Sequence, residues 1–189
     1  MQRRIGLTGG IASGKSSVGK LLEARGWPVL DADHFARELL GPGTETTEAV
    51  LLRHPGVRRE ENRINREALG QIVFADASER EWLNGLIHPQ VRRCFEQSLS
   101  KYANHSTIVL MIPLLFEARF TDLCSEIWLV DCDEKQQLER LVLRNALSKE
   151  TAQARISAQW PMNRKRKLAD VLIDNRKTKR DLRDQLLSL

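Results

Sequence analysis

The pattern G-x-x-x-x-G-K-S occupies residues 9–16 of the chain, Gly9-Gly10-Ile11-Ala12-Ser13-Gly14-Lys15-Ser16. This is the pattern of a phosphate-binding loop, which cradles the phosphates of a nucleoside triphosphate. Its glycines let the backbone turn tightly, so that successive N–H groups can approach the β-phosphate. The pattern assigns Lys15 to the β- and γ-phosphates and the Ser16 hydroxyl to Mg²⁺. The helix that follows directs the positive end of its dipole at the same anion.

The flanks of this loop fit the same interpretation. Ile5 and Leu7 alternate just before it, as in a short strand, and Val18 and Leu21 recur at helical spacing after it. Gly26-Trp27-Pro28 then ends the helix with a glycine followed by a proline. Strand, loop and helix come in the order that the motif requires, whereas a chance turn rich in glycine and serine leaves both flanks unexplained.

Length and composition are those of one globular domain, with room for a small lid. The chain has 189 residues, of which 41% are hydrophobic and 29% are charged. No apolar run approaches the ~20 residues of a membrane-spanning helix. Gly6, Gly9 and Gly10 also interrupt any signal-peptide core. We therefore expect a cytoplasmic protein with no membrane partner.

The cysteines and the basic residues suggest no further chemistry. Cys94, Cys124 and Cys132 form no C-x-x-C pair and are odd in number, so reduced thiols are expected rather than a disulfide or a metal site. The net charge is +5, and much of the excess lies in basic runs at 164–167 and 176–180. No aromatic-interleaved or groove-reading motif accompanies these runs. They are expected to be solvated faces or to steer polyphosphate substrates, with no nucleic-acid partner.

Apolar runs alternate with helical patterns along the chain. Five runs are typical of strands, at residues 5–8, 28–30, 107–112, 127–131 and 171–174. The third and fourth are nearly continuous, as in parallel strands covered on both faces. The gap between the second and third strands holds several helices and no convincing strand, although residues 43–63 fit either an ordered segment or a mobile loop. The sequence predicts a three-layer α/β domain whose helical insert is a substrate-binding subdomain.

Capping signals mark several helix starts. Ser78-Glu79-Arg80-Glu81 has the pattern of a capping box, and Thr178-Lys179-Arg180-Asp181 is its acidic variant. Pro89 fits a first helical position, so that His88 would end the preceding helix. The last helix of the insert carries an apolar stripe at Val91, Cys94, Phe95 and Leu99.

Asp31 and Asp33 are candidates for general-base chemistry. They directly follow the second strand, and ligands of open α/β sheets collect at the carboxyl ends of strands. A carboxylate within reach of an acceptor hydroxyl could take its proton during phosphoryl transfer. The alternative is that either residue only caps the helix that follows, and the spacing does not decide between the two.

Arg140 and Arg144 are candidates for binding the transferred phosphate. They stand at i and i+4 on one helix, whose apolar residues Leu138, Leu141 and Val142 point to the opposite side. A guanidinium suits the charge that develops on a phosphoryl group. The alternative is an ordinary solvated helix face.

Two further segments are ambiguous from the residues alone. His88 fits a structural role as well as a substrate contact. Residues 112–117 follow the third strand at the same edge of the sheet. Their apolar members, Leu115 among them, fit either the core or a pocket wall, and Glu117 fits either a substrate contact or a cap.

Together these motifs resemble the dephospho-coenzyme A kinase family. The resemblance rests on residues 6–16 and, in the family's order, on Asp31-Ala32-Asp33, His88-Pro89, Pro113-Leu114-Leu115-Phe116-Glu117 and Ala169-Asp170-Val171-Leu172-Ile173-Asp174-Asn175. Residues 147–156 with Gln159 resemble the family's lid. The phosphate loop alone would identify only a superfamily, whereas the whole set is specific and spans nearly the entire chain.

The resemblance implies a kinase that transfers the γ-phosphate of ATP, with Mg²⁺, to the ribose 3′-hydroxyl of dephospho-CoA. This is the last step of coenzyme A synthesis. It also implies the P-loop kinase fold with a five-stranded parallel sheet. The core would comprise residues 1–40, 105–144 and 166–189, with a helical CoA-binding insert at about 41–104 and a lid at about 145–165.

By position, the resemblance also implies the roles of single residues. Asp33 matches the proposed base, Lys15 the phosphate lysine, and Arg140 an arginine that approaches the phosphates from the lid side. Nucleotide contacts are expected from Gly9, Gly10, Ile11, Ala12, Ser13, Gly14, Lys15, Ser16, Ser17, Arg144 and Asn175, with Ser16 also the metal ligand. Substrate contacts are expected from Thr8, Asp33, His88, Leu115 and Glu117.

Three positions depart from the family's pattern. Ala12 replaces a usual glycine, so its φ is expected to be negative or only mildly strained. Ser17 replaces a common threonine and keeps a hydroxyl for the α-phosphate. Met111 stands where many members carry an acid, which leaves the surroundings of Mg²⁺ open.

Two other functions fit parts of the sequence. One is a kinase of the same fold with another small-molecule acceptor, and the other is a nucleotide-dependent switch. A GTPase-type switch would carry an N-K-x-D guanine motif, which the chain lacks. We expect a monomer or a weak homo-oligomer.

Overall fold

A five-stranded, wholly parallel sheet organises the first of two compact units in the computed structural model, which describes residues 2–189. The strand order is β2-β3-β1-β4-β5. The strands are β1 (Arg3–Gly9), β2 (Val29–Asp31), β3 (Thr107–Met111), β4 (Glu126–Asp131) and β5 (Val171–Asp174). Each predicted strand is confirmed to within two residues, and the α/β fold with it.

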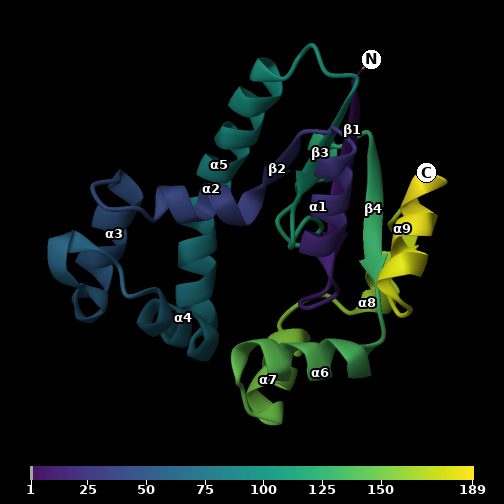
Figure 1. Ribbon diagram of the computed structural model, residues 1–189. Helices are drawn as coiled ribbons and strands as arrows, with labels where there is room; N and C mark the ends of the chain where they lie inside the picture. The colour runs from purple at the N-terminus through teal and green to yellow at the C-terminus, as the bar shows by residue number, and fades with distance from the viewer. Residues whose placement is uncertain (1) are drawn as a thin grey trace. The chain divides into compact units, whose positions relative to one another are not determined.

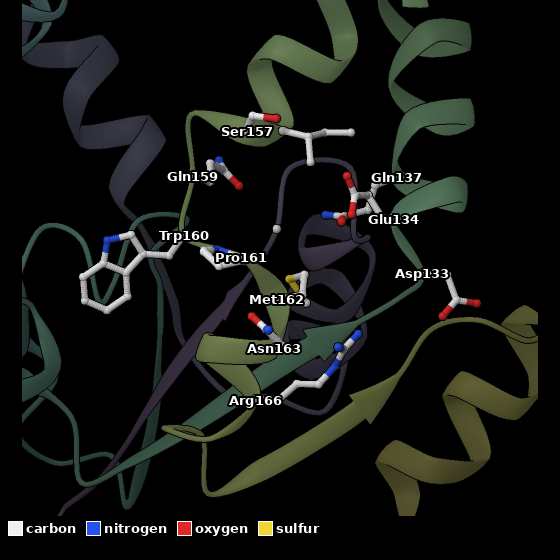
Figure 2. Close-up of a pocket in the computed structure, with 12 residues that line it drawn as sticks. Asp133, Glu134, Gln137, Ser157, Gln159, Trp160, Pro161, Met162, Asn163 and Arg166 are labelled. Atoms are coloured by element: carbon white, nitrogen blue, oxygen red, sulfur yellow. The ribbon is translucent and has the colours of Figure 1, made fainter.

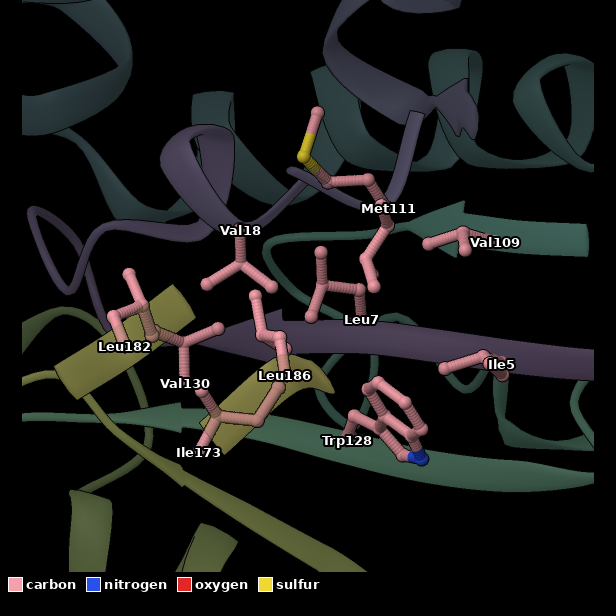
Figure 3. Close-up of a cluster of buried hydrophobic side chains, with 11 residues drawn as sticks. Ile5, Leu7, Val18, Val109, Met111, Trp128, Val130, Ile173, Leu182 and Leu186 are labelled. Atoms are coloured by element: carbon pink, nitrogen blue, oxygen red, sulfur yellow. The ribbon is translucent and has the colours of Figure 1, made fainter. Parts of the chain in front are cut away.

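The core of this unit lies between the sheet and two helices, α1 (Lys15–Ala24) and α9 (Lys179–Leu187). Val18 and Leu22 of α1 pack with Leu182 and Leu186 of α9 against one face of the sheet (Figure 3). That face presents Ile5, Leu7, Val109, Met111, Trp128, Val130 and Ile173. The alternating residues Ile108, Leu110 and Leu129 point the other way and are fully buried too. Both faces are therefore covered, which explains the near-continuous apolar runs.

Three helices connect β4 to β5. They are α6 (Glu134–Asn145), α7 (Lys149–Ser157) and α8 (Met162–Arg166). Figure 1 shows α6 and α7 beyond the carboxyl end of β4, where the chain also turns from β1 into α1. The parallel sheet thus gathers the phosphate loop and these helices at one edge.

The second compact unit spans Ala32–Ser98 and is helical. It contains α2 (Ala32–Leu39), α3 (Glu45–Arg53), α4 (Arg66–Ala75) and most of α5 (Ala77–Lys101), with short 3-10 turns at Pro55–Val57 and Glu60–Asn62. Its own core is built from Val50, Leu51, Val57, Ile64 and Leu69. Within the described part of this unit, the only extended pairing is an isolated bridge between Arg58 and Ile64.

The boundaries of this unit differ from those expected for the insert. The unit begins at Ala32 rather than near residue 41, because α2 packs with the other helices of the unit. The rings of Phe35 and Phe95 meet edge to edge, with centroids 5.0 Å apart. Residues 43–63 are ordered within the same unit, and Val57 is buried there. The assignments of this unit to CoA binding and of residues 145–165 to a lid stay predictions.

The expected helix break at Pro89 is wrong. Helix α5 runs unbroken from Ala77 to Lys101, with Pro89 inside it. A proline within a helix costs about 3 kcal/mol through its missing N–H and its ring. Ile87, Val91 and Phe95 are nearly or fully buried around it, and each contributes roughly 1.5–3 kcal/mol by burial. Packing on one stripe therefore outweighs the local penalty.

The prediction of a capping box at Ser78 is also wrong, because Asp76 caps the start of α5 instead. Asp76 Oδ1 accepts hydrogen bonds from the backbone N–H groups of Ser78 at 2.7 Å and Glu79 at 3.3 Å. These donors and the Ser78 hydroxyl hold the pKa of Asp76 below its usual value. The box at Thr178 and Asp181 is confirmed at the start of α9.

Candidate active site

The phosphate loop joins β1 to α1 with its lysine folded over it. Gly14 caps α1 in the left-handed region, at a φ of 101°. Lys15 Nζ donates hydrogen bonds to the carbonyl oxygens of Gly9 at 2.9 Å and Gly10 at 3.1 Å. Ser16 and Ser17 follow in the first turn of α1 with exposed side chains. The lysine is therefore held at the loop, next to two hydroxyls that can meet phosphates or a cation.

Three side-chain amides hold the backbone of this loop. Gln137 Nε2 of α6 donates to the Ile11 carbonyl at 2.9 Å, and Asn175 Nδ2 donates to the Ser13 carbonyl at 2.7 Å. The Ile11 N–H donates to Gln159 Oε1 at 2.8 Å. Figure 2 shows Gln137 and Gln159 on opposite sides of the loop. Carbonyl oxygens turned toward a polyphosphate would repel it, so engaging those of Ile11 and Ser13 with the amide N–H groups of Gln137 and Asn175 favours anion binding.

Two glycines of the loop make room for these amides. A Cβ atom on Gly10 would lie 2.0 Å from Gln137 Nε2, and one on Gly14 would lie 2.1 Å from Asn175 Nδ2. Neither amide could approach if these positions carried side chains. The glycines of the loop therefore allow Gln137 and Asn175 to pack against its backbone, in addition to allowing phosphate to approach.

Ala12 adopts the left-handed conformation, so of the two expectations, a negative φ or only mild strain, the negative φ is wrong. Its φ is 59°. The turn of the loop fixes this conformation, because the N–H of Ser13 reaches back to the Gly10 carbonyl at 3.1 Å. For an L-residue with a Cβ this costs roughly 1–2 kcal/mol. The strain is therefore local to the loop.

Arg140 and Asn175 lie together at the loop, whereas Arg144 does not join them. Arg140 donates to the Asn175 carbonyl at 2.9 Å, and Asn175 in turn bonds Ser13. The exposed Arg144 donates to its neighbour Asn145 at 2.8 Å. Arg140 is thus tied to the loop rather than lying on a solvated face.

The two acidic candidates follow β2 at the carboxyl edge of the sheet. Asp31 is the last residue of β2 and pairs with Met111 of β3. Asp33 lies two residues further, in the first turn of α2, and is exposed. Asp31 belongs to the first compact unit and Asp33 to the second.

The expected substrate contacts are engaged in the fold. Thr8 is fully buried, and its hydroxyl donates to the Pro113 carbonyl at 3.2 Å. Leu115 is fully buried in the core. Glu117 Oε1 accepts a hydrogen bond from the backbone N–H of Trp160 at 3.0 Å and lies 2.7 Å from Lys165 Nζ. His88 lies within α5 of the second unit, where burial lowers its pKa. Substrate contact by these four residues stays a prediction.

Sequence reasoning singled out only part of the lining of the cavity beside the loop: Gly10 as a nucleotide contact, and Ile156 and Gln159 through the resemblance to the family's lid. This cavity has a volume of about 660 Å³ and is bounded by Gly10 and by side chains of α6, α8 and the segment between α7 and α8. Gln137 and Arg166 were not expected there. Arg166 donates hydrogen bonds from Nε and Nη2 to the Asp131 carboxylate, at 2.8–3.1 Å. Gln137 stands one turn before Arg140, and that spacing is the only sequence signal for it.

Comparison with known proteins places the chain among kinases. The dephospho-CoA kinase family model matches residues 3–181. The chain belongs to the dephospho-CoA kinase family. A protein named dephospho-CoA kinase from Synechococcus sp. (strain CC9605) is 62% identical over 176 residues, which is 92% of this chain and 85% of the relative. Another so named, from Parasynechococcus marenigrum (strain WH8102), is 58% identical over 93% of this chain and 88% of the relative.

Solved structures agree with the family assignment. A protein from Thermus thermophilus matches with a TM-score of 0.84 and 34% identity, over 99% of this chain and 95% of that one. A dephospho-CoA kinase from Campylobacter jejuni matches with a TM-score of 0.72 and 27% identity, over 100% and 95% of the two chains. A shikimate kinase from Aquifex aeolicus, at 16% identity and a TM-score of 0.56, shares the fold. The P-loop kinase fold is therefore confirmed.

Residues 2–189 contain no cluster of three or more His, Cys, Asp or Glu side chains that could hold a metal. The Met111 side chain offers no oxygen, and its sulfur packs so close to Gly19 that a Cβ atom added there would lie 3.1 Å from it. The exposed Ser16 hydroxyl fits Mg²⁺, which commonly takes one or two protein oxygens and completes its shell with phosphates and water.

Cys94, Cys124 and Cys132 are free thiols, as predicted. Among the helices described, none is long and apolar enough to cross a membrane.

Proposed function

We propose that this protein transfers the γ-phosphate of ATP to the ribose 3′-hydroxyl of dephospho-CoA, giving CoA and ADP. The observation that carries the proposal is the family match over residues 3–181. The assembly of Lys15, Arg140 and Asn175 around the phosphate loop supports it, because phosphoryl transfer is mainly positioning and charge stabilisation. The reaction would be the last step of CoA biosynthesis.

In this mechanism the loop binds the phosphates of ATP through backbone N–H groups and the N-terminus of α1. Lys15, which bonds two loop carbonyls, would exchange them for the β- and γ-phosphates. Arg140 approaches from α6 and would stabilise charge on the transferred group. Ser17 would bind the α-phosphate, and Asn175 would lie near the adenine.

Asp33 is proposed to act as the general base. Its carboxylate would accept the proton of the 3′-hydroxyl as the oxygen bonds to the γ-phosphorus and the bond to the β–γ bridging oxygen breaks. The support is its place two residues after the carboxyl end of β2. The helical unit Ala32–Ser98 would hold the rest of dephospho-CoA.

Ser16 would hold Mg²⁺ together with phosphate oxygens of ATP. When bound, the ion supplies positive charge that offsets the charge of the phosphates. The free thiols support a reducing compartment, and we propose that the enzyme works in the cytoplasm as a monomer or weak homo-oligomer.

The test is ADP release by the purified protein with Mg²⁺–ATP and one acceptor at a time. Dephospho-CoA should give ADP with CoA as the matching product, while AMP, CMP and shikimate should give none. ADP formed only with another acceptor would overturn the substrate and leave the fold intact. No ADP with any acceptor would support the nucleotide switch instead.

Lys15→Ala is the companion variant for this assay. It should lower kcat by roughly 10²-fold or more, because it removes a cation from the transition state. Unfolding curves of the variant establish that it is folded. Near-normal turnover in a folded variant would contradict the role of the phosphate loop.

A further inference from the structure

Lys165 of α8 is a fully buried cation that the proposed mechanism does not use. Its side chain is 0% exposed, and its Nζ lies 2.7 Å from Glu117 Oε1, whose side chain is 16% exposed. Removing two charges from water is expensive, and an apolar pair of similar volume is often as stable or more so. Stability alone therefore does not account for the pair.

The Glu117 carboxylate also fixes the backbone of Trp160. Its Oε1 atom accepts the Trp160 N–H at 3.0 Å. The Trp160 ring stacks on Phe116, with a centroid distance of 6.4 Å and an interplanar angle of 3°. The Arg164 guanidinium lies 3.3 Å from the ring centroid. In Figure 2 the Trp160 indole lies apart from the other labelled side chains, on one side of the cavity that it helps to line.

Gln159, the residue before Trp160, contacts the phosphate loop directly. Its Oε1 accepts the Ile11 N–H at 2.8 Å, across 148 positions of sequence. Since the peptide that joins Gln159 to Trp160 donates to Glu117, the backbone of Gln159 is set by the ion pair. A continuous series of contacts thus runs from Lys165 through Glu117, Trp160 and Gln159 to Ile11.

We propose that Glu117 and Lys165 are positioning residues that hold the phosphate loop in its nucleotide-binding conformation. Lys165 fixes the Glu117 carboxylate, the carboxylate fixes Trp160, and Gln159 then holds the Ile11 peptide. A loop ordered in advance loses less conformational entropy when it binds nucleotide. The inference rests on the proposed function in assigning magnesium-nucleotide binding to this loop, and neither residue is required to touch a substrate.

Two double variants isolate the contact that matters. Glu117→Gln with Lys165→Met removes both charges but keeps an oxygen that can accept the Trp160 N–H. Glu117→Leu with Lys165→Met also removes both charges, and it leaves the Trp160 N–H without this acceptor. Both replace the ion pair by neutral groups of similar size, and both are expected to fold.

The readout is the Kd of Mg²⁺–ADP by titration calorimetry, together with KM for ATP, KM for dephospho-CoA and the unfolding midpoint. We expect the Gln variant to bind Mg²⁺–ADP within about twofold of the wild type. The Leu variant should bind about three- to tenfold more weakly, which is the scale of one net hydrogen bond. KM for ATP should rise in parallel with the Kd of Mg²⁺–ADP. Equal Mg²⁺–ADP affinities in the two folded variants would overturn the proposal.

Gln159→Leu tests the last contact of the series. Alone it should weaken Mg²⁺–ADP binding as much as the Leu double variant does, and combining the two should add little. Full additivity would show that Glu117 acts by another route. Mg²⁺–ADP binding requires no acceptor, so a wild type that binds it without phosphorylating dephospho-CoA would refute the proposed function alone.

Discussion

Asp33 is the residue on which proton transfer is proposed to depend. Asp33→Asn removes the basic carboxylate and keeps the size of the side chain. We expect kcat to fall by about 10²–10⁴-fold, the usual contribution of a positioned base, with the affinity for Mg²⁺–ADP unchanged. Steady-state kinetics and calorimetry measure the two quantities.

Asp31→Asn is the matched control for this prediction, because Asp31 ends β2 two residues earlier. It should lose far less activity than Asp33→Asn. A fully active Asp33→Asn enzyme would reduce Asp33 to a helix-capping residue, and an inactive Asp31→Asn enzyme would move the base to Asp31.

Ala12 carries backbone strain that a glycine would relieve. Its φ of 59° lies in the left-handed region, which an L-residue avoids and glycine does not. Ala12→Gly should therefore raise the free energy of unfolding by about 0.5–1 kcal/mol, after allowing for the greater entropy of glycine in the unfolded chain. Urea denaturation measures it. A lower free energy of unfolding would show that the strain is compensated elsewhere in the loop.

At the scale of elements, the start of α9 depends on its capping box. The Asp181 N–H donates to Thr178 Oγ1 at 3.2 Å, and the Thr178 N–H donates to Asp181 Oδ2 at 3.0 Å. Thr178→Ala should cost about 1 kcal/mol of stability, with Thr178→Ser within a few tenths of the wild type. Thermal unfolding of the two variants gives the comparison. Equal losses in both would show that the methyl group of Thr178, not its hydroxyl, stabilises the helix.

Elements buried in the sheet were predictable from sequence, and those shaped by distant packing were not. The strands at 107–111 and 126–131 can be recognised in the sequence because strands covered on both faces need continuous apolar residues. The helix boundary predicted at Pro89 was wrong because α5 stays unbroken through the burial of Ile87, Val91 and Phe95. This burial is a tertiary effect that the local sequence does not show. Local patterns therefore locate elements better than they locate helix ends.

The same limit applies to the site. The phosphate loop is contiguous, so its glycines and Lys15 could be found in one stretch of sequence. Gln137 lies 126 positions from Ile11, and Gln159 lies 148 positions away. An uncharged amide follows no motif of its own, and only the fold brings these two side chains to the same residue, Gln137 to the Ile11 carbonyl and Gln159 to the Ile11 N–H. Sequence could therefore predict what binds phosphate but not what holds the loop.

At the scale of the whole molecule, the thiols couple stability to pH. Burial raises the pKa of Cys124 from its ordinary value of 9.0 to about 12. Above pH 9 the unfolded chain therefore loses this proton while the folded protein keeps it, so the folded state binds more protons and stability falls as pH rises. The contribution of the Cys124 thiol to the free energy of unfolding is fully present below pH 9. It is lost progressively up to about pH 12, by about 1.4 kcal/mol per pH unit.

Cys124→Ala should accordingly flatten the dependence of unfolding free energy on pH between about 9.5 and 11. Denaturant unfolding of wild type and variant, under reducing conditions at several pH values, gives the two slopes. The lysines and the tyrosine that titrate in the same range contribute equally to both slopes, so their contributions cancel in the difference between the two slopes. The Cys124 sulfur lies 3.7 Å from the Phe120 carbonyl, so the variant should also lose a small amount of stability that does not depend on pH. Parallel slopes would show that the buried thiol ionises in the folded state as readily as in the unfolded chain.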